Sequence, residues 1–217
     1  MIKWRRLFCS VIGVAIYAKS LFAMEFDFEP LSSLCRIEVN LATGFGNGTV
    51  RGTFGKLNGK MSFFPENPQQ TKGNLVLAAR SLRFGYGKVA YQTHAPDWLD
   101  STKYPTITFQ LNKLSDFSWH GRELRAEAHG DLTIKGISQN ISIPMSINYL
   151  RGERRKYEGR SGDLIRLDGV VSIPRSKFGL SPGSYLDSIM EEIDVIVSIT
   201  GASSQVRRFL PSRIFDY

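Results

Sequence analysis

Strict alternation of apolar and polar residues recurs along most of this 217-residue chain. Side chains on a β-strand point alternately to opposite faces, so each alternating segment presents one apolar face and one polar face. The alternation is clearest in segments 37–41, 107–111, 141–149 and 193–199. Many such strands with almost no helix between them must bury one shared apolar face, so the pattern predicts an all-β sandwich or barrel. The alternation alone does not say whether the apolar face points inward, around a cavity, or outward.

About eight strands are expected, and the segments that carry the pattern can be placed on the chain. They are residues 34–41, 50–54, 57–64, 75–82, 106–114, 124–134, 141–150, 164–173 and 192–200. Hairpins are expected at residues 118–122 and 136–139, where turn residues separate two strand patterns. The strands therefore follow one another closely, as they do in an antiparallel meander.

Residues 93–100 do not alternate. A hydroxyl residue, Pro96, two acids and Trp98 follow one another there, which is typical of the start of a short helix. Such a helix would cover one end of a barrel as a lid. The alternative is a surface crossover in which Trp98 serves only to pack the core.

The net charge of +8 belongs mostly to the two ends of the chain. Residues 1–23 carry +4 and residues 203–217 carry +2, which leaves +2 for residues 24–202. A body so nearly neutral gives no support for nucleic-acid binding. Residues 1–23 join a basic start to about a dozen apolar residues, too few to cross a bilayer, and this pattern predicts a secretory signal peptide.

Histidines and cysteines are too few for a recognisable catalytic or metal site. The histidines are His94, His120 and His129, and no metal-ligand or nucleophile motif accompanies them. Cys9 lies in the signal segment, so Cys35 has no partner for an intramolecular disulfide. A covalent homodimer is left open, but a lone cysteine beside Ile37 and Val39 is more often a small core residue. The sequence therefore predicts neither an enzyme, nor a metal protein, nor a cofactor protein.

Four ordered motifs resemble those of the YceI-like family of polyisoprenoid-binding, lipocalin-like periplasmic proteins. They lie in residues 48–61, 94–109, 130–138 and 175–180. The resemblance implies a lipocalin-like eight-stranded antiparallel β-barrel over residues 34–202, with a short helix near one end and an apolar internal channel. Residues 1–23 would then be the signal peptide, 24–33 an N-terminal linker and 203–217 a basic C-terminal tail.

The resemblance also implies a ligand, a long-chain isoprenoid-type lipid such as a polyprenyl or quinone-like amphiphile, held by a periplasmic carrier, storage or scavenging protein. The ligand-binding residues expected on the channel wall are Phe54, Ile107, Phe109, Leu132, Ile134, Ile143, Met145, Phe178 and Leu180. Those expected near the opening are His94, Trp98 and Arg175. Arg175 is the candidate for a headgroup phosphate or carbonyl, and the alternative for it is a structural ion pair with Asp97 or Asp168.

Two other functions compete with this one. A small outer-membrane β-barrel has the same alternation with its apolar face outward, although residues 207–213 are basic and interrupted by proline. An enzyme acting on such a lipid would need His94 or Arg175 for turnover. Transient contact with a membrane surface and a homodimer are both left open. The charged loop 151–160 is either solvated or the part that touches such a surface. Nucleic acid is not expected as a partner.

Overall fold

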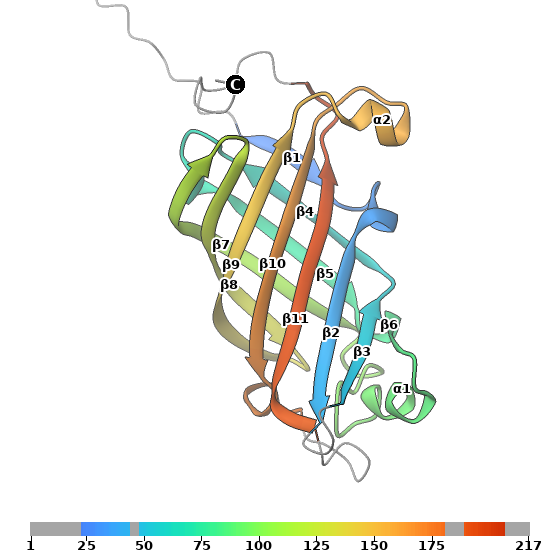
Figure 1. Cartoon of the computed structure of the whole chain (residues 1–217). Coiled ribbons are helices and arrows are strands. Elements are labelled where there is room, and N and C mark those ends of the chain that lie inside the picture. The colour runs from blue at the N-terminus through green and yellow to red at the C-terminus, as the bar shows by residue number, and fades with distance from the viewer. Residues whose placement is uncertain (1–22, 44–47, 181–188, 207–217) are drawn as a thin grey trace, which may run out of the picture.

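In the computed structural model, which describes residues 23–43, 48–180 and 189–206, strands form one antiparallel sheet that curls into a barrel (Figure 1). The strands are β1 (Met24–Asp27), β2 (Arg36–Thr43), β3 (Thr49–Phe54), β4 (Leu57–Phe63), β5 (Lys72–Ala78), β6 (Leu82–Phe84), β7 (Thr106–His120), β8 (Glu123–Ile134), β9 (Ile137–Leu150), β10 (Leu164–Pro174) and β11 (Ile189–Ala202). The α-helices are α1 (Gly87–Thr93) and α2 (Arg154–Glu158). The 3-10 turns are η1 (Ser32–Leu34), η2 (Pro68–Gln70), η3 (Ala79–Ser81) and η4 (Arg175–Phe178).

Eight of these strands close into a ring. Their order is β1-β4-β5-β7-β8-β9-β10-β11, and the ring closes where Asp27 of β1 pairs with Ala202 of β11. Strands β2, β3 and β6 continue the sheet from β11. The eight-stranded antiparallel barrel expected from the sequence is thus confirmed.

Two short strands do not stand out in the sequence. Strand β1 lies in residues 24–33, where a linker is expected, and it pairs along its whole length with β4. It contains only Met24 and Phe26 as apolar residues, too few to show a period, yet both are buried. Strand β6 is three residues long and is separated from β5 by η3, so the predicted strand 75–82 is in fact two strands.

The hairpin between β8 and β9 is tighter than expected. Its turn consists of Lys135 and Gly136, whose φ angles are 51° and 76°. Two central residues with positive φ form the type I′ turn that suits a two-residue hairpin. Strand β9 therefore begins at Ile137, four residues before the predicted start at Ile141.

The short helix lies before Pro96 and not after it. Helix α1 spans Gly87–Thr93, with His94 as its C-cap, and residues 94–99 form turns in place of the predicted helix. Proline disfavours helical backbone in the residue before it, so Pro96 ends this helix. The turns bring Leu99 back under the helix, since its amide donates a hydrogen bond to the carbonyl of Thr93 at 3.0 Å.

The two helices mark the two ends of the barrel. Helix α1 lies at the lower end in Figure 1, beside β6, and α2 lies at the upper end, between β9 and β10. We use "α1 end" and "α2 end" for them below. No helix in the described ranges is long and apolar enough to cross a membrane.

Candidate functional site

The interior of the barrel contains a cavity of about 170 Å³ with an apolar wall. Apart from Lys60, Gly73 and Asn74, every lining residue is hydrophobic. The hydrophobic ones are Phe28, Ile37, Val39, Leu41, Phe54, Met61, Leu75, Leu77, Leu82, Phe84, Trp98, Leu99, Ile107, Phe109, Leu111, Leu114, Ala128, Leu132, Ile134, Ile141, Ile143, Met145, Ile147, Leu167, Val171, Ile173, Leu180, Ile193, Val195, Val197 and Ile199. The apolar face of the strands therefore points into the barrel.

The cavity does not fill the barrel evenly from end to end. Several inward side chains nearest the α2 end are packed together and do not line it. Phe26 and Tyr149 meet edge to face there, with ring centroids 6.4 Å apart, and Phe63 lies 6.4 Å from Trp119. Leu124 has no exposed surface at all. The α2 end is therefore a packed core and closes the channel.

The α1 end is covered differently. The segment from β6 through α1 to residue 99 contributes Leu82, Phe84, Trp98 and Leu99 to the cavity lining. Leu180, which follows η4, lines it from the neighbouring side. Trp98 is 3% exposed and faces the cavity, so it belongs to the wall. The hollow part of the barrel thus reaches the end that α1 covers.

Glycines make room for the large side chains of the hollow part. A Cβ atom on Gly130 would lie 2.5 Å from the ring of Phe109, and one on Gly52 would lie 2.6 Å from the ring of Phe84. A Cβ atom on Gly201 would lie 2.9 Å from the ring of Phe28. These rings therefore lie close over glycine backbone, against the wall.

Nine of the twelve predicted ligand-binding residues line the cavity. They are Phe54, Trp98, Ile107, Phe109, Leu132, Ile134, Ile143, Met145 and Leu180. His94, Arg175 and Phe178 do not line it, and Phe178 is 1% exposed and packed in the core. Contact of any of the twelve with a ligand stays a prediction.

Many lining residues are absent from that prediction although the sequence carries a signal for them. Ile37, Val39 and Leu41 on β2 line the cavity, as do the four apolar residues of segment 193–199 on β11. Their strict alternation, together with the inward orientation of one strand, would have identified them. Leu82 lies at the end of the predicted strand 75–82, whereas Phe84 and Leu99 lie outside every predicted strand.

His94 holds the α1 segment against β6. Its Nε2 lies 3.1 Å from the carbonyl oxygen of Leu82, and its Nδ1 is buried with no hydrogen-bond partner among the described residues. Burial lowers the pKa of His94 below 6.5; the hydrogen bond to Leu82 opposes this shift, and the positive charges of Arg83 and Arg80 add to it. The neutral imidazole is therefore the form that fits this site.

Arg175 binds backbone rather than facing the cavity. Its guanidinium donates to the carbonyl of Leu180 at 3.0 Å and to that of Met190 at 3.3 Å, and its Nε lies 3.8 Å from a carboxylate oxygen of Glu191. This ion pair is with neither of the acids suggested by the sequence; Asp168 pairs instead with Arg166. Arg175 thus ties η4 to the start of β11.

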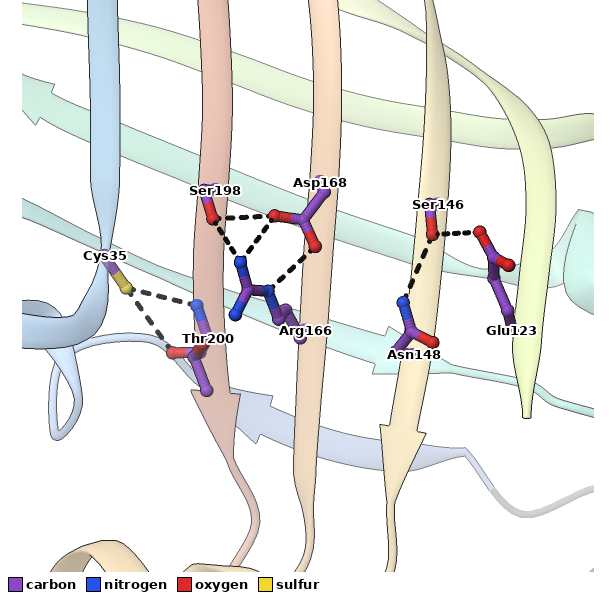
Figure 2. Close-up of polar contacts among 8 residues, drawn as sticks. All are labelled: Cys35, Glu123, Ser146, Asn148, Arg166, Asp168, Ser198 and Thr200. Atoms are coloured by element: carbon purple, nitrogen blue, oxygen red, sulfur yellow. Dashed lines mark hydrogen bonds and ion pairs between the residues drawn. The ribbon is translucent and has the colours of Figure 1, made fainter.

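The outer face of β8 to β11 carries a polar network (Figure 2). Arg166 donates to Asp168 at 2.9 and 3.2 Å, and Ser198 donates to the same carboxylate at 2.7 Å. Burial acts to raise the pKa of Asp168, but these hydrogen bonds outweigh burial and hold that pKa below its usual value. On the neighbouring strands, Ser146 donates to Glu123 at 2.7 Å. Charged groups in mid-strand are costly on a lipid-facing surface, which argues against an outer-membrane barrel.

Cys35 lies at the edge of this outer face, where Figure 2 shows it beside Thr200. Its Sγ accepts a hydrogen bond from the amide of Thr200 at 3.3 Å. Burial raises the pKa of the thiol, and the hydrogen bond from Thr200 opposes that shift only in part. Among the described residues, no group of three or more His, Cys, Asp or Glu side chains is arranged to hold a metal ion.

Comparison with known families and proteins gives one consistent result. The YceI-like domain matches residues 26–201. Protein YceI of Shigella flexneri is 25% identical over 162 residues, which cover 74% of this chain and 78% of that protein. A UPF0312 protein of Ectopseudomonas mendocina is 22% identical over 191 residues, covering 88% of this chain and 94% of its own.

Solved structures share the fold at lower identity. BcnA of Burkholderia cenocepacia superposes with a TM-score of 0.63 at 20% identity, covering 78% of this chain and 97% of that one. A polyisoprenoid binding domain from Saccharophagus degradans, implicated in plant cell wall breakdown, superposes with a TM-score of 0.61 at 12% identity. That match covers 84% of this chain and 99% of that domain.

Proposed function

This chain belongs to the YceI-like family, and from that premise we propose that it binds a long-chain isoprenoid-type lipid, a polyprenyl or quinone-like amphiphile, inside its barrel. The observation that carries the proposal is the apolar cavity, which is closed by packing at the α2 end and reaches the α1 end. Each buried methylene contributes about 0.8 kcal/mol, so a long chain binds well in such a cavity without directional contacts. The similarity in fold to a polyisoprenoid binding domain supports the same ligand class.

We propose that the protein carries, stores or scavenges this lipid in the periplasm and does not turn it over. The basic and apolar segment 1–22 that supports export lies outside the described residues, as does the tail from residue 207. His94 and Arg175, the candidates for turnover, do not line the cavity. Transient contact with a membrane belongs to this proposal, because such a lipid must be collected from a bilayer or delivered to one; a homodimer stays open.

Native mass spectrometry of the purified protein tests the ligand. We expect a bound mass that is released on denaturation and identified as an isoprenoid-type lipid, and addition of a polyprenol or quinone to emptied protein should raise its melting temperature. Empty protein from repeated preparations, with no rise in melting temperature, would refute the proposal.

Two methionines provide a matched pair of variants. Met145 lines the cavity, whereas Met190 is 54% exposed. The amide in Met145→Gln would stand unpaired in an apolar cavity, so we expect a large loss of lipid occupancy. Met190→Gln should keep the occupancy of the wild type. Equal occupancy in both variants would place the ligand outside the barrel.

A further inference from the structure

The two ends of the barrel differ in a way that bears on how a lipid enters. The α2 end is filled by Phe26, Phe63 and Tyr149, which are at most 2% exposed. At the α1 end, the described residues that cover the cavity are those of the segment with Trp98 and Leu99, together with Leu180. A chain inserted from the α2 end would have to displace that aromatic core. The channel must therefore open at the α1 end.

The outer surface of this covering segment has exposed tyrosines. Tyr86 precedes α1 and is 59% exposed, and Tyr91 on α1 is 82% exposed. Val89, between them, is buried, so α1 turns one side to the barrel and presents these rings to solvent. A tyrosine has an apolar ring and a polar tip, and it is enriched where hydrocarbon meets water at a membrane surface.

The same segment is positively charged. Residues 80–103 contain four cations, Arg80, Arg83, Lys88 and Lys103, and two acids, Asp97 and Asp100. All four cations are exposed. Within the described ranges, Arg80, Arg83 and Lys103 form no ion pair with a carboxylate, so their charge is not neutralised by the protein.

The α2 end offers an internal comparison. It too has an exposed tyrosine, Tyr157, and a set of cations in α2. Two of these cations are paired, since Lys156 lies 2.6 Å from Glu153 and Arg154 lies 2.5 Å from Glu158. Arg155 and Arg160 are exposed and, within the described ranges, form no ion pair, so both ends carry unpaired cations. The ends differ in the channel, which is closed by packing at the α2 end and hollow at the α1 end.

We propose that the surface formed by residues 80–103 docks on anionic phospholipid bilayers and brings the channel opening to the membrane. The proposal rests on the proposed lipid-binding function, because the cavity decides which end must face the lipid. Unpaired cations attract an anionic leaflet, and the two tyrosines insert at the headgroup level. A long apolar chain can then pass between bilayer and barrel without crossing water.

Sedimentation of the purified protein with vesicles tests this surface. The triple variant Arg83→Gln/Lys88→Gln/Tyr91→Ser removes two cations and one tyrosine from the α1 end. One cation near an anionic surface is worth about fivefold in partitioning, so we expect at least a tenfold loss of binding to phosphatidylglycerol vesicles. The wild type should bind neutral phosphatidylcholine vesicles far more weakly and lose its phosphatidylglycerol binding as salt is added.

A matched variant at the α2 end is the control. Arg155→Gln/Arg160→Gln/Tyr157→Ser removes the same number of cations and tyrosines, and we expect it to bind vesicles within twofold of the wild type. Contributions from the rest of the chain are the same in both variants. Equal losses in the two variants, a larger loss in the α2 variant, or no binding by the wild type would each overturn the proposal.

A separate measurement distinguishes this proposal from the proposed function. Lipid supplied in detergent micelles reaches the protein without a bilayer, and native mass spectrometry then reports occupancy. Full occupancy in the α1 variant, together with slow uptake from vesicles, supports docking as a distinct step. Failure of the wild type to take up lipid from micelles would refute the lipid-binding function, whereas normal uptake from vesicles by the α1 variant would refute docking alone.

Discussion

A phenylalanine at position 128 should shorten the channel from its closed end. Ala128 is inward-facing and lies closest to the packed α2 end among the three residues of β8 that line the cavity. Its neighbours across the sheet, Leu114 and Ile143, also line the cavity. The side chain of Ala128→Phe would therefore enter empty space.

The expected loss of affinity depends on how much of the ligand chain the new phenyl ring displaces. A phenyl ring would take the place of about four to six methylenes of a ligand chain, which is about 3–5 kcal/mol. That energy corresponds to a loss of about 10²- to 10³-fold or more in affinity for a chain long enough to reach position 128. Shorter chains should bind unchanged. In the empty protein the ring gains burial, so the free energy of unfolding should rise by about 1.5–3 kcal/mol.

The same substitution two residues away is the control. Ala126 points into the barrel from the same strand and is 6% exposed, but it lies in the packed part and does not line the cavity. Ala126→Phe should overpack this core and lower the free energy of unfolding by about 1–3 kcal/mol. Denaturant unfolding of both variants, with native mass spectrometry against lipids of graded length, provides the measurements. Equal destabilisation by both variants would refute the claim that the barrel is hollow at position 128 and packed at position 126.

Three other residues allow tests that need no ligand. The pKa of His94 is lowered in the folded protein, so the stability that His94 contributes is present above pH 6.5 and is lost as the pH falls through the lowered pKa. In calorimetry, mild acidification should therefore lower the melting temperature of the wild type more than that of His94→Gln. Burial raises the pKa of Cys35, so its alkylation by iodoacetamide near neutral pH should be slower than that of a free cysteine and should become fast on unfolding. Tyr149 donates to the buried carboxylate of Asp163 at 2.5 Å, so Tyr149→Phe should cost about 1–3 kcal/mol in denaturant unfolding, and an unchanged midpoint would contradict this role.

The strands were predictable because alternation is a local property. The segment 141–149 shows it residue by residue, and its inward residues up to Ile147 line the cavity. The ring of eight strands also follows, since so many two-faced strands must close around one apolar interior. β1 was not predictable, because its four residues acquire strand structure by pairing with β4 and β11, which lie far away in the sequence.

The ends of the barrel were less predictable than its wall. The position of α1 depends on whether Pro96 begins or ends a helix, and a proline with acids after it is compatible with both. The role of Arg175 depends on the carbonyls of Leu180 and Met190, which come together only in the folded chain. Local sequence patterns carry no information about such contacts.

Whether the barrel is hollow is decided by the size of inward side chains and by what lies opposite them. A barrel of eight strands is just wide enough either to be filled by its own side chains or to hold a small ligand. In the packed part, Phe26 and Tyr149 meet each other across the interior. In the hollow part, the ring of Phe109 covers Gly130, where a Cβ atom would lie 2.5 Å from it, so the ring stays at the wall. Phe109 above Gly130 thus leaves the axis of the barrel open, whereas Phe26 and Tyr149 fill the interior where they meet.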